Sequence, residues 1–278
     1  MSGRLLVVAT PIGNLGDLSP RATEALAGAD VIACEDTRRT RRLLTYAGIT
    51  GRPLLAVHDQ NEGERVPRVL ELLAQGRQVA LVSDAGLPGV SDPGQHLVAE
   101  VIAAGHDVVV IPGPSAGVTA LVGSGLPTAR WVFEGFLPRK GGDRARRVAE
   151  VAAEHRTVVL YEAPHRVRRT VEDLSAACGP HRRVALAREL TKLHEQVWRG
   201  GLGAAAAHLA ASEPRGEFTI VLDGAPDRPP ASDEDVEAAL TALLEDGESR
   251  RRAVDEVAAA LALPRRRVYE IALRLGRG

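Results

Sequence analysis

The sequence predicts an α/β body of two subdomains followed by a small all-helical domain. Short runs of Val, Ile and Leu alternate with amphipathic stretches up to Leu222, as strands alternate with helices around a mostly parallel sheet. A proline-rich segment then ends this alternation, and only helical periodicity follows it. The expected boundaries are 1–112 and 113–224 for the two α/β subdomains, 225–232 for a linker and 233–278 for the helical domain.

Five apolar runs in the first subdomain predict buried strands. The stretches between them carry apolar residues at helical spacing, over 20–28, 37–46, 61–75 and 94–104. Because each strand is followed by a connection long enough for a helix, the sheet is expected to be mostly parallel. The five strands are expected to begin near Leu5, Val31, Leu54, Val79 and Val108.

The second subdomain predicts another sheet, with some antiparallel pairs. The intervals between its last three strands are too short for a helical crossover each time. The Ala-rich segment 203–211 reads as an ordinary helix. The expected strands lie near 131–133, 157–160, 184–187, 196–198 and 218–222.

The segment from Asp223 to Ser232 holds three prolines and predicts a linker. Three amphipathic helices are expected after it, and the last two resemble a helix-turn-helix in which Pro264 suits the first helical turn. Arg265 and Arg266 open the last helix, where a nucleic-acid reader carries its contacts. A three-helix interaction domain that binds no nucleic acid is the alternative interpretation.

Three loops rich in Gly, Pro and polar residues follow predicted strands, at 9–17, 83–94 and 112–117. The carboxyl ends of parallel strands are where α/β sheets bind ligands, and glycine lets the backbone approach a bound molecule closely. Any one such loop reads as a plain turn. Three of them on one edge of a sheet predict a ligand site.

The composition and the absence of several catalytic motifs limit the classes of reaction that the protein could catalyse. The chain has 278 residues, a net charge of −1 and two cysteines, Cys34 and Cys178, which are expected to be packing residues in a reducing compartment. No signal or membrane segment is expected, so the predicted location is cytoplasmic. P-loop, Gly-x-Gly-x-x-Gly, zinc-hydrolase and serine-hydrolase motifs are all missing from the sequence. Catalysis is expected to use a soluble cofactor or none, and no metal.

Basic residues gather in several short runs although the chain is almost neutral. Such runs are often solvated surfaces, but several of them predict that positive charge is segregated onto one face that binds RNA. Only eight residues are aromatic, which argues against a stacking platform for long single strands. The candidate RNA contacts are Arg38, Arg41, Arg139, Lys140, Arg166, Arg265 and Arg266.

Several motifs, in this order and spacing, resemble the small-subunit ribosomal RNA 2′-O-ribose methyltransferase I family, a branch of the tetrapyrrole methylase superfamily. The resemblance spans essentially the whole chain. It implies a two-domain methylase body, S-adenosylmethionine as cofactor, a homodimer, and a cytidine ribose in the decoding centre of 16S RNA or the 30S subunit as methyl acceptor. The motifs are Val8–Leu18, Cys34–Arg38, His58–Glu62, Ser83–Gly94, Pro112–Ser115, Tyr161–Arg166, Arg188–Lys192 and Gly216–Thr219.

By similarity to the superfamily, the cofactor is expected to lie against residues from both subdomains. Asp92 is expected to cap the helix that follows it, which would leave Asp84 free to face the ligand. Ser115 could equally cap the next helix, and the two roles can coexist. The expected cofactor contacts are Pro11, Asp84, Leu87, Ser115, Ala116, Tyr161 and Ala187.

A ribose hydroxyl that attacks an activated methyl group needs alignment and a weak base. The candidate bases are His58, Glu62, Asp36 and Glu189. Each has a plainer interpretation: Asp36 as a helix cap, the His58 loop as exposed surface, and Glu189 as part of a surface ion pair. Two other functions stay open, a tetrapyrrole methyltransferase and a ligand-sensing DNA-binding regulator.

Overall fold

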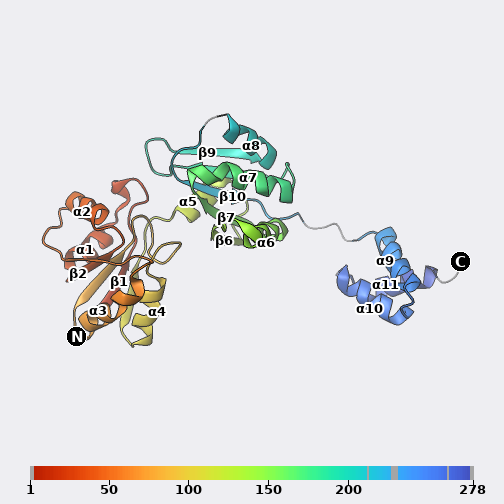
Figure 1. Cartoon of the computed structure of the whole chain (residues 1–278), viewed down its shortest axis with the longest axis horizontal. Helices are drawn as coiled ribbons and strands as arrows, with labels where there is room; N and C mark the ends of the chain where they lie inside the picture. Colours follow the sequence, from red (N-terminus) through yellow and green to blue (C-terminus); the bar gives the residue numbers. More distant parts are fainter. Residues whose placement is uncertain (1–2, 212, 227–230, 262, 276–278) are drawn as a thin grey trace. The chain divides into compact units, whose positions relative to one another are not determined.

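The computed structural model describes residues 3–211, 213–226, 231–261 and 263–275. The chain divides into two compact units, Met1–Ala225 and Pro226–Gly278 (Figure 1). Part of the predicted linker, 227–230, lies outside the described residues.

The first sheet is parallel throughout, with strand order β3-β2-β4-β1-β5. This confirms the predicted alternation of strands and helices. Helices α1 and α2 have the predicted bounds because Ser19 and Asp36 cap them, and Pro20 stands in the first turn of α1. The strands are Arg4–Val8, Val31–Cys34, Leu54–Ala56, Gln78–Val82 and Asp107–Ile111, and the helices α1 to α4 are Pro20–Gly28, Thr37–Tyr46, Glu62–Ala74 and Gln95–Ala103.

Helices cover both faces of this sheet, and consecutive residues of β1 therefore enter different cores. Leu5 and Val7 pack with α3 and α4, whereas Leu6 and Val8 pack with α1 and α2. Side chains alternate between the faces of a strand, so a strand buried on both sides reads as a continuous apolar run. This burial keeps the ends of the strands, and the loops that follow them, in fixed positions.

The second sheet is mixed, with order β6-β7-β10-β8-β9. Only β6 and β7 are parallel, and the three other pairs are antiparallel, as the short connections predicted. Strand β6 is longer than expected because a bulge between Phe133 and Gly135 carries it on to Phe136. The strands β6 to β10 are Trp131–Phe136, Thr157–Glu162, Arg183–Arg188, Gln196–Gly201 and Phe218–Leu222.

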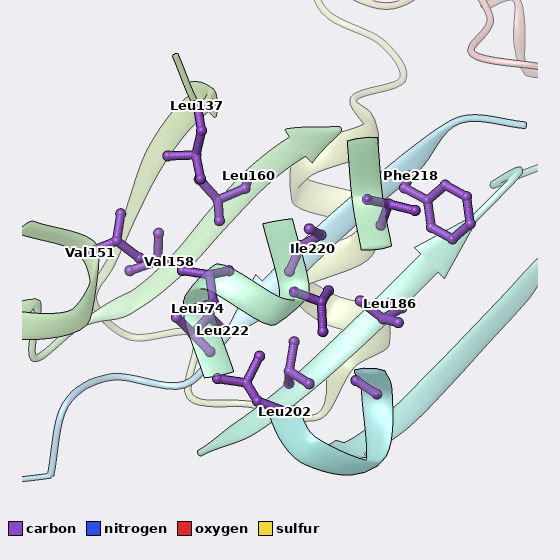
Figure 2. Packing of buried hydrophobic residues seen from close by; sticks show 14 of the residues in the cluster. Leu137, Val151, Val158, Leu160, Leu174, Leu186, Leu202, Phe218, Ile220 and Leu222 are labelled. Carbon is purple, nitrogen blue, oxygen red and sulfur yellow. The ribbon is translucent and has the colours of Figure 1, made fainter. Parts of the chain in front are cut away.

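Two layers of helix cover this second sheet. Helix α5 (Ala116–Ser124) packs on one face, against β7, β8, β9 and β10. Figure 2 shows the core on the other face, where leucines of α7 and α8 such as Leu174 and Leu202 meet Leu160 and Ile220 of the sheet. The helices α6, α7 and α8 are Gly141–Ala153, Pro164–Cys178 and Leu202–Ala210.

The second unit is a bundle of the three predicted helices, α9 (Asp233–Glu245), α10 (Arg250–Ala260) and α11 (Arg265–Leu275). Its core includes Val236, Leu240, Val254, Val257, Val268 and Ile271. Ser232 and Asp235 form a capping box at the start of α9. Among the described residues, the structure contains no helix of the length and apolarity that a membrane span requires.

Candidate active site

The three predicted ligand loops meet at one edge of the first sheet because they follow adjacent strands, β4, β1 and β5. Thr10 and Gly86 join two of the loops by a pair of backbone hydrogen bonds, 2.8 and 3.1 Å between nitrogen and oxygen. The third loop is equally close, since a Cβ on Gly113 would lie 2.8 Å from the Cβ of Ala9. Gly86 has a φ of +83°, which few other residues tolerate. The loops therefore form one fixed wall.

Next to this wall lies a pocket of about 390 Å³, within the range of small-molecule sites, roughly 300–1,000 Å³. Its floor comes from the second sheet and includes Tyr161, Ala187 and Thr219. The Tyr161 hydroxyl accepts a hydrogen bond of 3.0 Å from the amide of Gly117 on α5. Most of the lining is apolar, and its other members include Ile12, Leu87, Val90, Ala116, Phe136, Leu190 and Phe218.

Asp92 is the carboxylate in this pocket that stands out. Burial, with the negative charges of Glu35, Asp84 and Asp59 nearby, raises the pKa of Asp92 to about 6. Asp92 shares a side-chain hydrogen bond with Ser83, which offsets part of this rise, whereas the other acidic lining residues form ion pairs: Glu162 with Arg166, and Glu217 with Lys192. Asp92 therefore carries a negative charge at neutral pH that is easily neutralised, by a proton or by a cationic ligand.

Most of the expected cofactor contacts lie in this pocket. Leu87, Ser115, Ala116, Tyr161 and Ala187 line it. Ser115 stands at the N-cap position of α5, but its side chain makes no capping bond and instead hydrogen-bonds with Tyr161 in the pocket. Pro11 is buried beside the lining residue Ile12 and does not itself line the pocket. The cofactor roles of these residues stay predictions.

The expected cap of α4 by Asp92 was wrong, while the cofactor role of Asp84 stays a prediction. Asp84 does not line the pocket: its carboxylate accepts a hydrogen bond of 3.1 Å from the amide of Asp36 and pairs with Arg39 at 3.3 Å. Asp92 does not cap α4, since Gly94 is the N-cap residue and Glu62 accepts hydrogen bonds from the amides of Gly94 and Leu97 at 3.1 and 2.7 Å. A buried Glu62 has taken the capping role, which leaves Asp92 to face the pocket.

None of the four candidate bases lines this pocket. Asp36 caps α2, and its hydrogen bonds with Arg38 lower its pKa to about 2. Glu189 accepts hydrogen bonds from Lys192 Nζ and the Glu217 amide, at 2.8 and 2.9 Å. His58 is half-buried in the turn that precedes α3, and Glu62 is the cap of α4. Their catalytic roles stay predictions, while the geometry gives three of them structural partners.

Sequence reasoning missed Asp92, Phe136 and Thr219 as pocket residues. Asp92 and Thr219 stand in motifs that the sequence had already singled out, so their placement on the loop and on β10 was the available signal. Phe136 carried no signal, because Gly135 interrupts the apolar run that predicts β6.

Comparison with known proteins identifies the family. Residues 4–206 match the family described as Tetrapyrrole (Corrin/Porphyrin) Methylases, and residues 230–276 match the RsmI C-terminal HTH domain. A protein of Synechocystis sp. named Ribosomal RNA small subunit methyltransferase I is 48% identical over 98% of both chains. Proteins of the same name from Thermotoga maritima and Escherichia coli O157:H7 are 44% and 45% identical, over 80% of this chain and 99% and 78% of theirs. The chain belongs to the ribosomal RNA small subunit methyltransferase I family.

Solved structures agree with this fold. The methyltransferase CobJ superposes with a TM-score of 0.61 at 23% identity, over 83% of this chain and 98% of its own. The cobalt precorrin-4 methyltransferase CbiF superposes with a TM-score of 0.60 at 14% identity, over 80% of this chain and 94% of its own. At these identities the likeness establishes the tetrapyrrole methylase fold of this methyltransferase I family member and nothing of its substrate.

The candidate RNA contacts of this methyltransferase I family member are placed unevenly. Arg38 and Arg41 are exposed on α2, where Arg38 pairs with Asp36. Arg139 and Lys140 are exposed just before α6. Arg166, in the first turns of α7, is partly buried and pairs with Glu162 at 3.2 Å.

In the helical domain of this methyltransferase I family member, the two candidate arginines both have acidic partners. Arg265 pairs with Asp255 of α10, and Arg266 pairs with Glu270 at 3.0 Å. Arg250 and Arg251 on α10 are exposed, and within the described residues no ion pair engages them. RNA contact by this domain stays a prediction. The exposed Arg250 and Arg251 of α10 are less engaged by carboxylates than Arg265 and Arg266 of α11.

In this methyltransferase I family member, Asp92→Asn is expected to raise the melting temperature at pH 7. The folded-state pKa of about 6 lies above the ordinary 3.8, so the aspartate contributes stability that is complete below 3.8 and lost as the pH rises through 6. The amide removes this cost of burying a charge, for a gain of about 2–4 °C per kcal/mol. Thermal unfolding from pH 4 to 8 measures it. If the difference in melting temperature between the variant and the wild-type protein does not shrink toward pH 4, the raised pKa of Asp92 is contradicted.

Proposed function

We propose that the protein is an S-adenosylmethionine-dependent methyltransferase that modifies the 2′-hydroxyl of a cytidine ribose in the decoding centre of 16S small-subunit RNA. The observation that carries the proposal is a mostly apolar pocket lined by the half-buried carboxylate of Asp92, at the strand ends of a chain that matches curated small-subunit RNA methyltransferases over most of its length. The RNA class follows the names of those relatives, and the cytidine and the 2′-hydroxyl follow the family resemblance of the motifs.

The pocket fits the proposed cofactor. An adenine ring needs an apolar slot, and Leu87, Ala116 and Ala187 supply apolar lining. A sulfonium cation favours a negative surrounding, which Asp92 provides in the pocket lining and to which the nearby charges of Glu35 and Asp84 add. These residues would hold the cofactor, which supplies an activated methyl group when it is bound. Among the described residues no group of three or more His, Cys, Asp or Glu could hold a metal ion.

The residues of the protein would align the acceptor hydroxyl and accept its proton. The joined loops fix the wall of the pocket, so the acceptor hydroxyl can be held in line with the methyl group, and alignment supplies much of the acceleration in such displacements. Asp92 is our candidate to accept the hydroxyl proton, because a base works best when its pKa lies near the working pH. The Tyr161 hydroxyl, fixed by the Gly117 amide, would orient a polar group of either ligand.

The test of this function is a map of ribose methylation in small-subunit RNA. A strain that lacks the gene should lack one 2′-O-methyl group, and purified protein with S-adenosylmethionine should restore it on isolated 30S subunits. Transfer to a tetrapyrrole without any change in the RNA would favour the alternative methylase function. Tight binding of duplex DNA without methyl transfer would favour the regulator.

We further propose a cytoplasmic homodimer. Apolar side chains remain exposed on the first unit, at Val118 and Val122 of α5, Val110 of β5 and Trp131 of β6. Exposed apolar groups of this kind are typical of surfaces that pair with another chain. Light scattering coupled to size exclusion measures the mass in solution, and a monomer at micromolar concentration would contradict the dimer.

Truncation after Pro229 should leave a protein that folds and binds S-adenosylmethionine, because residues 1–225 form a compact unit with their own cores. RNA affinity should fall. If the helical domain neutralises phosphates, the plot of log affinity against log salt should flatten by about 0.7–0.9 for each phosphate that the truncated chain no longer neutralises. Arg250→Gln with Arg251→Gln in the full chain separates charge from folding. Equal affinity and equal slope for the truncated and full chains would show that the domain does not bind RNA.

A further inference from the structure

A second cavity, of about 350 Å³, lies in the first unit and is lined by Arg139, Arg144, His165, Arg166 and Arg169. Every one of these lining residues is basic. Two carboxylates reach them: Asp173 pairs with Arg144 at 2.7 Å and with Arg169 at 3.9 Å, and Glu162 pairs with Arg166 at 3.2 Å. Four guanidinium groups against two carboxylates leave a formal surplus of two positive charges.

Two of the arginines form a rigid frame. Arg144, with a side chain 5% exposed, donates to the carbonyl of Pro138 at 3.0 Å and to the hydroxyl of Thr170 at 3.0 Å. Arg166 donates to the carbonyl of Leu137 at 2.5 Å. Because both side chains hold the backbone that leads to Arg139, the start of the loop before α6 is fixed to α7.

The other lining residues are exposed at the rim of the cavity, and only a long ion pair to Asp173 engages Arg169 among the described residues. Arg139 and His165 are exposed, and the Arg169 side chain is 65% exposed. Within the described residues, no ion pair occupies Arg139. Guanidinium groups bind phosphate oxygens in a bidentate manner, so a fixed pair of arginines with exposed ones at the rim suits a phosphate group.

This cavity adjoins the cofactor pocket along the chain. Glu162, Ala163 and Pro164 line the cofactor pocket, and the next residues, His165 and Arg166, line the basic cavity. Both sites thus share the end of β7 and the start of α7. One substrate that extends past the end of β7 can therefore present a hydroxyl to the pocket and an anionic group to the basic cavity.

We propose that the basic cavity binds one phosphodiester group of the RNA substrate, close to the nucleotide that receives the methyl group. The inference rests on the proposed function. Arg139, His165 and Arg169 contact the phosphate, and Arg144 and Arg166 position them. The exposed rim favours a polymer, whose chain must enter and leave the cavity, over a free anion, which small-molecule sites usually enclose.

The test measures binding of a short labelled single-stranded RNA by the full-length protein at several salt concentrations. Arg139→Gln and Arg169→Gln should each raise the dissociation constant about tenfold and flatten the salt slope by about 0.7. Arg146→Gln is the matched control, because Arg146 is exposed on α6 and pairs with Asp143 outside the cavity. The dissociation constant for S-adenosylmethionine should stay unchanged in all three variants. Cavity variants that bind RNA as the control does would overturn the proposal.

A parallel titration with inorganic phosphate separates the two sources of the anion. Weak phosphate binding beside tight RNA binding is expected. Tight phosphate binding that Arg139→Gln abolishes, with RNA affinity unchanged, would assign the cavity to a free anion and overturn the proposal. Methylation of 30S subunits is measured separately. If the cavity variants lose RNA affinity but the wild-type protein does not methylate the 2′-hydroxyl, the proposed function is wrong while the phosphate site is supported.

Discussion

Asp92→Asn should bind RNA normally and S-adenosylmethionine somewhat less tightly, yet at saturating cofactor it should lose turnover by about 10²–10⁴-fold, the usual contribution of a positioned general base. The amide keeps the size and the hydrogen-bond acceptor of the side chain but cannot take the hydroxyl proton. In the wild-type protein, turnover should fall as the pH drops through about 6, where Asp92 becomes protonated. The variant should show no such limb in its pH profile.

Single-turnover methylation of 30S subunits measures this loss directly. Asp107→Asn is the matched control, because Asp107 is an exposed aspartate at the start of β5 and lies outside the pocket lining. If the Asp92 variant instead binds S-adenosylmethionine weakly and reacts at a normal rate once saturated, Asp92 serves the sulfonium and does not accept the proton. Turnover equal to that of the control would remove Asp92 from the reaction altogether.

Glu162→Ala should destabilise the fold by about 3–5 kcal/mol, the usual cost of removing one partner of a buried ion pair. The Glu162 side chain is fully buried, and it accepts hydrogen bonds from the Thr170 hydroxyl at 2.6 Å and the Ala163 amide at 2.9 Å, besides its pair with Arg166. Alanine leaves a guanidinium and a hydroxyl without their acceptor. Glu162→Gln keeps an acceptor and should cost less.

Urea unfolding measures the free energy of each variant. Glu172→Ala is the control, since Glu172 is exposed on the same helix. If Glu162→Ala and Glu172→Ala unfold at the same urea concentration, the network around Glu162 contributes nothing net to stability, and the frame of the basic cavity would need another explanation.

The helices and strands could be predicted from local patterns, but the roles of the acidic residues near the pocket could not. Glu62 caps α4, the role expected of Asp92, and Asp92 lines the pocket, the role expected of Asp84. Helices α1 and α2 begin where Ser19 and Asp36 supply caps, which are signals within a few residues. The cap of α4 comes from Glu62, which is 32 residues away from Gly94 in sequence. Nothing local distinguishes Asp84 from Asp92, since both stand in the same glycine-rich loop. Tertiary contacts decide which aspartate faces the pocket: α2 engages Asp84 through Asp36 and Arg39, and Glu62 of α3 caps α4 in place of Asp92.

The same limit applies to the basic cavity. Arg139 and Arg166 could be named as RNA contacts because they stand in runs of positive charge. That Arg144 is buried as part of a frame, and that Arg169 and His165 share its cavity, depends on how α6 packs against α7. Charge runs predict which segments are basic, and tertiary packing decides which cations remain unpaired.

The order of strands in the first sheet also bears on how the chain folds during synthesis. Strand β1 leaves the ribosome before the other strands of this sheet. Its two neighbours are β4 and β5, and in the β1–β5 register Arg4 lies opposite Asp107. Roughly a hundred residues must therefore be translated before β1 has both partners, which takes about 5–20 s at 5–20 residues per second. During that interval the apolar segment Arg4–Val8 is exposed on the nascent chain. A chaperone that binds apolar segments could bind Arg4–Val8 during this interval. Its access would end once β5 has left the ribosome and paired with β1.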